Sequence, residues 1–532
     1  MIKKIPKITL LVFVVLVMGS GCTPLGPNFE GLGKPAIPDK WQKESMRNEQ
    51  QIAQWWKIFG DPTLNKLIKK AYAQNLDIKS AGLRIVQARM ALGVSEGYVY
   101  PQLQTLSGNA ASVKSGKNEF ASAAVNFDIG WELDFWGKYA RNIESAEANL
   151  YQSIASYNDI MVSIIAEVAR NHINYRTAEE RIAYATRNIT IQERVAEMTQ
   201  VQFNAGNVSE LDMQQARSQL YNTRSILPSI AITQVKAKNA LALLLGMDEK
   251  RVSRILDAGS KKRADSVNRY IGEKKRDTIQ IKQGNSDLLN VAMVPVAKFN
   301  PHYKIDANLI TRRPDIKVAE YQVRSNNALI GATVAELYPS FSLFGNIGLS
   351  PNNATGAWVS GSNALGVSVG PSFSWNIWQY DRIKNQIRIR DAVFEESIVN
   401  YNKKVLTAIQ EISDALSSYE LGKQQQEENR KAVEATVRAF NISVIQYNDG
   451  LVNYERLLTT VESLTRTQDQ YAQIKGGLSN YVVLLYKALG GGWQTKRGSS
   501  YLSRETAEEM KKRVDWGRYL DAKMTTLPKD MQ

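Results

Sequence analysis

The segment FEESIVNYNKKVLTAIQEISDALSSY, from Phe394 to Tyr419, decides the fold class of this chain. Its apolar residues recur at alternating intervals of four and three, at Phe394, Ile398, Tyr401, Val405, Ile409, Ile412, Leu416 and Tyr419. A spacing that averages 3.5 residues predicts a helix packed as a coiled coil. From Tyr380 to Asn448 the only glycine is Gly422 and there is no proline, so the helix is predicted to be very long.

A second stretch of the same kind, Lys138 to Phe203, contains neither proline nor glycine. It carries the same rhythm at Leu150, Ile154, Tyr157, Met161, Ile164 and Val168. At 1.5 Å per residue, about 65 residues make a rod of about 100 Å. Globular helices average about 11–12 residues, so an ordinary compact core is excluded.

The sequence contains an internal repeat, so that the chain consists of two similar copies. Asp77-Ile78 and Tyr100-Pro101 recur 238 residues later as Asp315-Ile316 and Tyr338-Pro339. Further along the chain the offset is 244, because Asn204 and Gly206 recur as Asn448 and Gly450. Each copy predicts a helix (Leu64–Tyr98 and Asp315–Tyr338), a β-hairpin, a long helix, a turn and a return helix.

Strand patterns lie between the helices of each copy. From Leu365 to Ile377 and from Val125 to Phe135, apolar residues alternate with Gly, Ser, Asn, Asp and Glu. Phe341 to Leu349 gives a third such face, and Pro101 to Val113 a weaker fourth. Segments of about ten alternating residues are typical of transmembrane barrel strands, although a soluble sheet with one buried face is the alternative.

Four strands cannot close a barrel, because about eight is the smallest number observed and open sheet edges are not tolerated in lipid. Two copies of the chain would supply eight strands and three would supply twelve. Only the larger barrel leaves room for a lumen, which suits the small and polar residues of the alternating segments. The sequence therefore favours a trimer.

The N-terminus is predicted to be a lipoprotein signal peptide. Three lysines precede an apolar run of eleven residues, Ile8 to Met18, which is too short to span a bilayer. Gly19-Ser20-Gly21 then leads to Cys22, the only cysteine, which we interpret as a lipid-attachment site. Thr23 rather than aspartate follows it, which favours sorting to the outer membrane.

Several kinds of chemistry have no support in the sequence. The net charge of +15 is spread along the chain of an exported protein, so we expect no nucleic-acid partner. The two histidines, His172 and His302, are far apart, and His172 is expected to pack between helices. No metal-ligand cluster, phosphate loop or nucleophile elbow is present, so we expect no enzyme, no metal and no cofactor beyond the N-terminal lipid.

Three segments carry a family resemblance: QWWKIFGDPTLNKLIKKAYAQNLDI (Gln54–Ile78), RRPDIKVAEYQVRSNNALIGATVAELYPSFSL (Arg312–Leu343) and LYKALGGGW (Leu485–Trp493). They resemble the TolC-like outer-membrane efflux factors, in the lipoprotein branch that serves resistance-nodulation-division pumps. The resemblance implies an α+β membrane protein. Duplicated coiled-coil hairpins would form a periplasmic tube, and four strands per protomer would contribute to a twelve-stranded trimeric barrel. It also implies opening by a periplasmic adaptor coupled to an inner-membrane pump.

The resemblance also locates a periplasmic gate at the second turn between long and return helix. In the family a ring of inward aspartates commonly lies a few residues beyond this turn, but here that position is Thr459. Glu455, Arg456 and Glu462 are nearby charges that could form an altered ring or simply keep a helix end solvated. The candidate gate residues are Tyr447, Asp449, Tyr454, Glu455, Arg456 and Thr459. For Tyr447 the alternative is a packing role, which it would share with Phe203 at the equivalent turn of the first copy.

The predicted organisation follows from these features. It comprises a signal peptide (1–21), a lipidated segment (22–56), the first repeat (57–247), a connector (248–305), the second repeat (306–493) and a polar tail (494–532). The connector carries Lys261-Lys262-Arg263 and Lys274-Lys275-Arg276, expected as a solvated loop with adaptor docking as the alternative. The tail is predicted to hold a helix around Glu505 to Asp521.

The predicted function is passive conduction of small toxic compounds or drugs from periplasm to exterior. A duct of the same architecture for type I protein secretion is the closest alternative. A non-conducting coiled-coil scaffold of the envelope is an alternative of another class, which has no use for membrane strands.

Overall fold

The computed structural model describes residues 24–33, 52–115, 118–257, 294–297, 299, 310–353, 359 and 361–527. The signal peptide, Cys22, both basic runs of the connector and His302 lie outside the described residues. The chain divides into two units. The first comprises Met1–Pro35, Leu83–Ser156 and Asp315–Lys404, and the second comprises Ala36–Gly82, Tyr157–Pro314 and Val405–Gln532.

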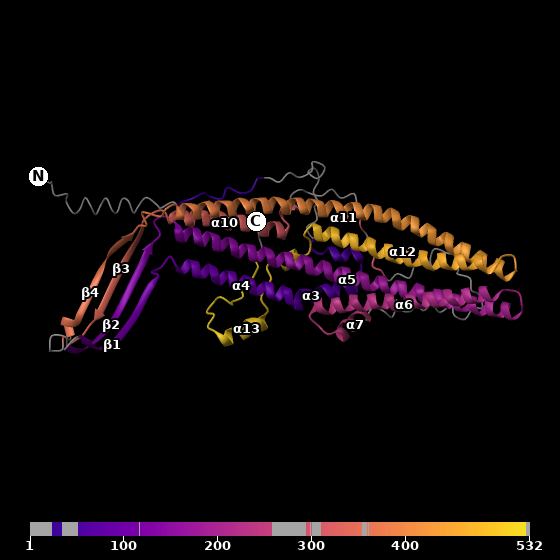
Figure 1. Ribbon diagram of the computed structural model, residues 1–532, viewed down its shortest axis with the longest axis horizontal. Coiled ribbons are helices and arrows are strands. Elements are labelled where there is room, and N and C mark those ends of the chain that lie inside the picture. Colours follow the sequence, from indigo (N-terminus) through magenta and orange to yellow (C-terminus); the bar gives the residue numbers. More distant parts are fainter. Residues whose placement is uncertain are drawn as a thin grey trace. The chain divides into compact units, whose positions relative to one another are not determined.

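The first unit contains one antiparallel sheet with the strand order β1-β2-β3-β4 (Figure 1). Its strands are β1 (Leu103–Ser115), β2 (Asn118–Leu133), β3 (Ser340–Leu349) and β4 (Leu365–Ser374), and the 3₁₀ helix η4 (Gly361–Ala364) precedes β4. Pairing of β2 with β3 joins the hairpin of the first copy to that of the second. The four predicted strands are confirmed, although β4 ends at Ser374, before Trp375 and Ile377.

The register separates the two faces of this sheet. Val125, Phe127 and Ile129 of β2 lie opposite Leu349, Ile347 and Gly345 of β3, and this side of the sheet is exposed and apolar. The alternate positions of all four strands carry mainly Ser, Thr, Asn, Gly, Asp and Glu. Side chains of successive strand residues point to opposite faces, so the alternation seen in the sequence becomes one apolar and one polar face.

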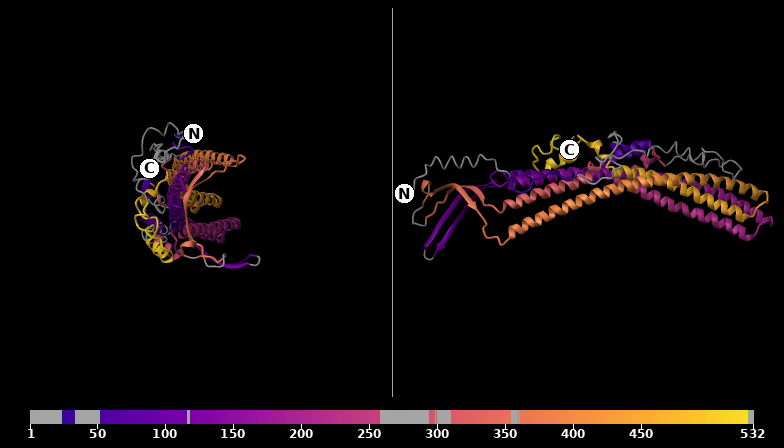
Figure 2. Two further views of the ribbon diagram at one scale, coloured as in Figure 1. Left: turned by 90° about the vertical axis from the view of Figure 1, so that its left-hand side faces the viewer. Right: turned by 90° about the horizontal axis from the view of Figure 1, so that it is seen from above.

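The two longest described helices are α5 (Lys138–Asn204) and α11 (Arg382–Asn448), each of 67 residues. Each is followed by its return helix, α6 (Glu210–Leu245) or α12 (Tyr454–Ala488), and Figure 2 shows each pair side by side up to its turn. The predicted long helices are therefore confirmed. No described helix is long and apolar enough to cross a membrane alone. Only α6 with α7 (Glu249–Asp257), bent by 108°, meets that test of length and composition as a pair.

The buried seam of α11 differs from the predicted one at four positions. Tyr401, Val405, Ile412 and Tyr419 are buried as expected, but Phe394, Ile398, Ile409 and Leu416 are only half-buried. Ala408 and Ala415 occupy the seam in place of Ile409 and Leu416. The intervals of four and three are preserved, and the small alanines allow a close approach of the neighbouring helix. In α5 all six predicted seam residues are buried.

The first opening helix was predicted as continuous from Leu64 to Tyr98, and this is wrong. The chain breaks at Asn75 into α3 (Pro62–Gln74) and α4 (Leu76–Gly97). Asn75 has an extended backbone, its amide bonds to the carbonyl of Ala71, and its side-chain oxygen accepts from the amide of Ile78. One residue thus ends one helix and caps the next. The helix of the second copy, α10 (Pro314–Ala335), is unbroken.

The C-terminal tail folds back on itself. It contains η5 (Trp493–Lys496) and α13 (Arg504–Arg513), so the helix predicted up to Asp521 is too long. Val514 has an extended backbone and ends α13. The amide of Tyr501 bonds to the carbonyl of Thr525, and Tyr501, Leu502, Met510, Leu520 and Leu527 are buried. A further short helix, η2 (Trp55–Phe59), lies near the start of the second unit.

Candidate functional site: helical tip, inter-hairpin seam and N-terminal clamp

The two turns at the ends of the long helices have the same construction. After α11, the amide of Gly450 bonds to the carbonyl of Tyr447 at 3.1 Å, and after α5 the amide of Gly206 bonds to that of Phe203 at 2.9 Å. Both glycines have positive φ, +70° and +78°, a conformation that only glycine adopts without strain. The repeat found in the sequence therefore extends to the backbone of the tip.

The caps of the two return helices differ. Ser209 and Asp212 form a reciprocal capping box at the start of α6. At the start of α12, Asn453 accepts from the amide of Arg456 at 3.3 Å, and arginine stands where the first copy has Asp212. The side chain of Arg456 is exposed, and no ion pair to it is found among the described residues. At the second turn the guanidinium of Arg456 is therefore exposed to solvent, whereas at the first turn the equivalent carboxylate of Asp212 is hydrogen-bonded in the cap.

The six predicted gate residues fall into two groups. Tyr447 and Tyr454 are only 7% and 3% exposed, and their rings meet edge to face with centroids 6.1 Å apart. Burial raises the pKa of both phenols, so both stay neutral at physiological pH. They belong to the protomer's own apolar core, with Phe440 and Leu457. Asp449, Glu455, Arg456 and Thr459 form the exposed group.

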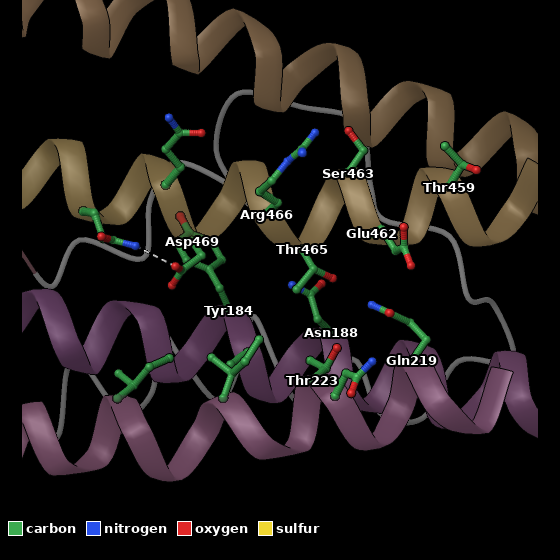
Figure 3. Close-up of a pocket in the computed structure, with 16 residues that line it drawn as sticks. Tyr184, Asn188, Gln219, Thr223, Thr459, Glu462, Ser463, Thr465, Arg466 and Asp469 are labelled. Atoms are coloured by element: carbon green, nitrogen blue, oxygen red, sulfur yellow. Dashed lines mark hydrogen bonds between the residues drawn. The ribbon is translucent and has the colours of Figure 1, made fainter. Parts of the chain in front are cut away.

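Thr459 lies at the rim of a groove of about 790 Å³ that α5, α6 and α12 line in common (Figure 3). The Thr459 hydroxyl donates to the carbonyl of Glu455 at 2.9 Å, so it is satisfied by its own helix. Glu462 lines the same groove, together with Asn188 of α5 and Gln219 of α6. The position at which the family commonly has an aspartate therefore carries a neutral side chain at the edge of this groove.

A polar seam joins the two helical hairpins where α5 meets α12. Lys475 Nζ donates to both carboxylate oxygens of Glu180 at 3.1 Å, and both side chains are buried. Nearby, Arg181 and Asp469 form a two-bonded ion pair of 2.7 and 3.1 Å. At Gly476 the helices are so close that an added methyl group would overlap the hydroxyl of Thr177. No local sequence signal identified these pairs, since Lys475 and Glu180 are 295 residues apart.

A second feature that the sequence did not reveal is a clamp on the N-terminal segment. Arg141, near the start of α5, is buried and donates to the carbonyl of Leu25 at 3.0 Å and to the side chain of Asn28 at 2.8 Å. The amide of Leu25 bonds to the carbonyl of Trp136 at 3.1 Å. Gly26 lies so close to Gly331 of α10 that neither position leaves room for a side chain. Residues 24–28 are thus held beside helices of both copies.

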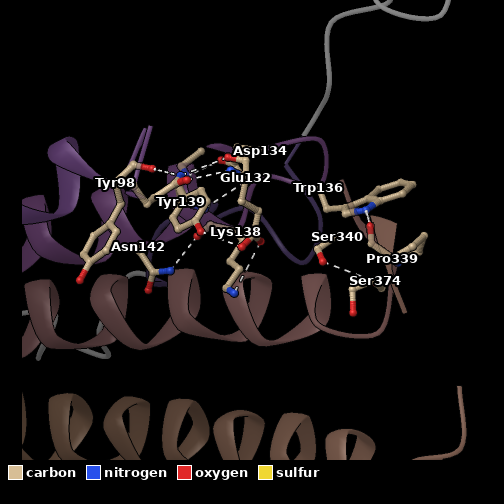
Figure 4. A network of polar contacts seen from close by, with 12 residues as sticks. Tyr98, Glu132, Asp134, Trp136, Lys138, Tyr139, Asn142, Pro339, Ser340 and Ser374 are labelled. Carbon is tan, nitrogen blue, oxygen red and sulfur yellow. Dashed lines mark hydrogen bonds and ion pairs between the residues drawn. The ribbon is translucent and has the colours of Figure 1, made fainter. Parts of the chain in front are cut away.

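Polar side chains also connect β2 to the start of α5 (Figure 4). Asp134 accepts from the amides of Tyr139 and Ala140 at 3.0 and 2.8 Å and so caps the helix. Glu132 accepts from the hydroxyl of Tyr139 at 3.0 Å, and Lys138 Nζ lies 3.9 Å from the same carboxylate. These contacts hold the first turn of α5 against the end of the strand.

His172 has a polar role in addition to the predicted packing role. Its Nε2 lies 2.7 Å from Asp61 Oδ2, and both side chains are buried. The other oxygen of Asp61 accepts from the amides of Thr63 and Leu64 at the start of α3. Within the part of the chain that the structure describes, no group of histidine, cysteine and carboxylate residues could hold a metal ion.

Comparison with known families covers both copies. The model described as outer membrane efflux protein matches residues 67–247 and 307–491. The chain belongs to the outer membrane efflux protein family. This confirms the predicted family and the duplicated α+β fold, and it identifies the chain as an outer-membrane efflux protein. The secretion and scaffold alternatives have less support, and the members of the family are transport proteins.

Relatives of this efflux protein match it over nearly their whole length. It is 26% identical to the probable outer membrane lipoprotein SilC of Salmonella typhimurium, with 92% of this chain and 99% of that protein covered. It is 24% identical to the cation efflux system protein CusC of Escherichia coli (strain K12), with 91% and 99% covered. Among solved structures, the outer-membrane channel OprN has a TM-score of 0.72 at 24% identity, covering 88% of this chain and 99% of OprN. The Campylobacter jejuni CmeC channel has a TM-score of 0.70 at 21% identity, covering 92% and 98%.

Proposed function

We propose that three copies of the mature chain form the exit duct of a tripartite efflux pump. The lipid on Cys22 anchors each copy to the outer membrane, in keeping with the name of the lipoprotein relative. A periplasmic adaptor opens the helical tip, and an inner-membrane pump supplies the energy. The duct itself conducts passively.

The observation that carries this proposal is the open sheet of the first unit. β1 and β4 each pair on one side only within the described residues, so a single chain has two sheet edges. The outward apolar face is highly exposed, with Leu106 at 73%, Val369 at 83% and Phe373 at 72%. A lipid bilayer accommodates an apolar face of this kind but not an open sheet edge. If β4 of each copy pairs with β1 of the next, the twelve strands of three copies close into a barrel without edges.

The helices offer a matching surface for neighbouring copies. α6 and α11 expose large apolar side chains, namely Leu211, Tyr221, Ile226, Ile232, Val235 and Leu243 on α6, and Ile389, Val399, Leu406, Leu421, Ile442 and Ile445 on α11. Stripes of this size on a monomer indicate a protein interface. A closed ring in which α6 of one copy packs against α11 of the next would bury both stripes.

The substrates proposed for this duct are small toxic compounds, drugs or cations. CusC is named as a cation efflux protein, and a relative from Pseudomonas aeruginosa, OpmQ, is named for pyoverdine export. Relatives with the same fold are thus named for chemically different cargoes. The pump rather than the duct is therefore proposed to select the cargo.

The gate is proposed to consist of the exposed tip residues Asp449, Glu455, Arg456 and Thr459. Tyr447 and Tyr454 support them from the protomer's core. In a three-fold ring, Glu455 and Arg456 can pair across neighbouring copies, and this pairing holds the tip closed until the adaptor engages it. The groove beside Thr459 is the proposed contact for the adaptor.

Cysteine cross-linking across the predicted strand contact tests the assembly. Cys22 is the only native cysteine and carries the lipid, so any disulfide that forms must join two introduced cysteines. Leu106→Cys on β1 combined with Val369→Cys or Phe373→Cys on β4 is expected to give covalent trimers in outer membranes. Either single variant alone should give none. Double variants that remain monomeric at every β1–β4 position tested would contradict the trimer.

A further inference from the structure

The polar face of the sheet carries charge of one sign only. Among the described strand residues, its charged side chains are Asp128 and Glu132, both on β2. The remaining positions on this face are mainly serine, threonine, asparagine, alanine and glycine. Lys114, a further charged strand residue, lies on the other face, and its backbone pairs with that of Glu119. In a closed barrel this polar face lines the lumen.

The two carboxylates differ in their surroundings. Glu132 accepts from the Tyr139 hydroxyl and has Lys138 Nζ at 3.9 Å, so its charge is partly compensated (Figure 4). Asp128 accepts from Asn346 Nδ2 at 2.7 Å across the β2–β3 pair. Asn346 is neutral, and no lysine or arginine of the described residues lies within ion-pair distance of Asp128. This hydrogen bond fixes the direction of the carboxylate but leaves its charge uncompensated.

We propose that Asp128 gives the open duct a preference for cations and positively charged small molecules over anions. The inference rests on the proposed trimer, because three-fold symmetry places three Asp128 carboxylates at one level of the lumen. Rings of acidic side chains are a known way of making a pore cation-selective. In this chain the charged ring lies in the barrel, whereas the family's usual acidic position at the tip is the neutral Thr459.

The size of the effect follows from Coulomb's law and salt screening. For an ion about 10 Å from each of three carboxylates in water, the attraction corresponds to an enrichment of roughly fourfold at 0.01 M salt. At 1 M salt, where the screening length is about 3 Å, the enrichment falls close to unity. A preference that depends on salt in this way distinguishes a ring in a wide lumen from a narrow filter.

Reversal potentials in planar bilayers under a salt gradient measure the preference. The trimer would be tested as wild type and with Arg456→Ala at the tip, each with and without Asp128→Asn. Asparagine keeps the shape and can still accept from Asn346. We expect Asp128→Asn to reduce the cation-to-anion permeability ratio at least twofold at 0.01 M salt and to leave it unchanged at 1 M. Glu505→Gln, the same charge change on exposed α13, should not alter the ratio.

The possible failures are distinguishable. A permeability ratio unaffected by Asp128→Asn in both backgrounds, with conductance intact, would overturn this inference and leave the proposed duct standing. So would a ratio that responds to Asp449→Asn at the tip but not to Asp128→Asn. A wild-type protein that forms no trimer and no conducting pore would overturn the proposed duct, and this inference with it.

Discussion

Arg141 and Asn28 are joined by a hydrogen bond of 2.8 Å that ties the N-terminal segment to the first turn of α5. The same guanidinium reaches the carbonyls of Leu25 and Gly26, at 3.0 and 3.3 Å, and pairs with Glu144 at 2.8 Å. These contacts hold residues 24–28 in the unit that carries the sheet.

Loss of the clamp should destabilise that unit. Arg141→Ala removes several hydrogen bonds to a charged donor, each worth about 1.5–3 kcal/mol, and leaves the carbonyls of the segment without a partner. We expect Arg141→Ala to lower the melting temperature of the trimer clearly. Arg141→Lys should lower it less, because lysine keeps the positive charge but lacks the planar guanidinium that donates several hydrogen bonds at once. Arg430→Ala is the control, because the ion pairs of the partly exposed Arg430 are with exposed glutamates of its own helix. Equal melting temperatures for Arg141→Ala and Arg430→Ala would contradict the clamp.

Two adjacent glycines of α12 should respond in opposite directions. Gly476→Ala places a methyl group onto Thr177 of α5 and is expected to destabilise the protein by about 1–3 kcal/mol. Gly477→Ala meets no atom within 4 Å and should stabilise the helix by about 0.5–1 kcal/mol. Denaturant or thermal unfolding of the two variants measures the difference. If both variants were stabilised, α5 and α12 would not be in close contact at this point.

The buried pair of Lys475 and Glu180 should show strong coupling. Lys475→Met removes the ammonium that donates to both carboxylate oxygens of the buried Glu180, and breaking a buried pair in this way costs about 3–5 kcal/mol. Lys475→Met combined with Glu180→Leu removes both charges and should restore much of this loss. A double-mutant cycle on the free energy of unfolding tests the pair. Additive losses in the double variant would show that the two charges do not interact.

The tip residues should separate into packing and gating positions. Tyr447→Phe retains the buried ring and is expected to change neither stability nor single-channel conductance by much, whereas Tyr447→Ala should cost about 3–5 kcal/mol. Glu455→Ala and Arg456→Ala leave the core intact and are expected to raise conductance by relaxing the tip. Wild-type conductance in both of these variants would argue against the gate at these residues.

The sequence predicted the long helices and strands because their signal is periodic and repeated. Intervals of four and three over Phe394–Tyr419, and alternation over Leu365–Ser374, are properties of a single segment. The break at Asn75 was missed because one asparagine acts as both the end of α3 and the cap of α4, and nothing in its neighbours differs from a continuous helix. The exchange of Leu416 for Ala415 in the seam was missed because alanine suits either face.

The site was less predictable than the fold. For Tyr447 the sequence left packing open as the alternative to gating, whereas the burial of Tyr454 became visible only once α11 and α12 were packed together. Lys475 and Glu180, like Arg141 and Asn28, are far apart in sequence, and each residue alone resembles an ordinary surface side chain. Lys475 and Glu180 meet through the packing of helices from different copies, and Arg141 meets Asn28 through the docking of the N-terminal segment. Neither contact is encoded locally in the sequence. Thr459, by contrast, stood out from the sequence because the resemblance supplied a position to compare.

The central claim is that one chain leaves its sheet open and three chains close it. Native mass spectrometry of the mature protein, released from outer membranes in mild detergent, tests this claim most directly. We predict a single dominant species with three times the mass of the lipid-bearing chain. A dominant, folded monomer under the same conditions would contradict the account.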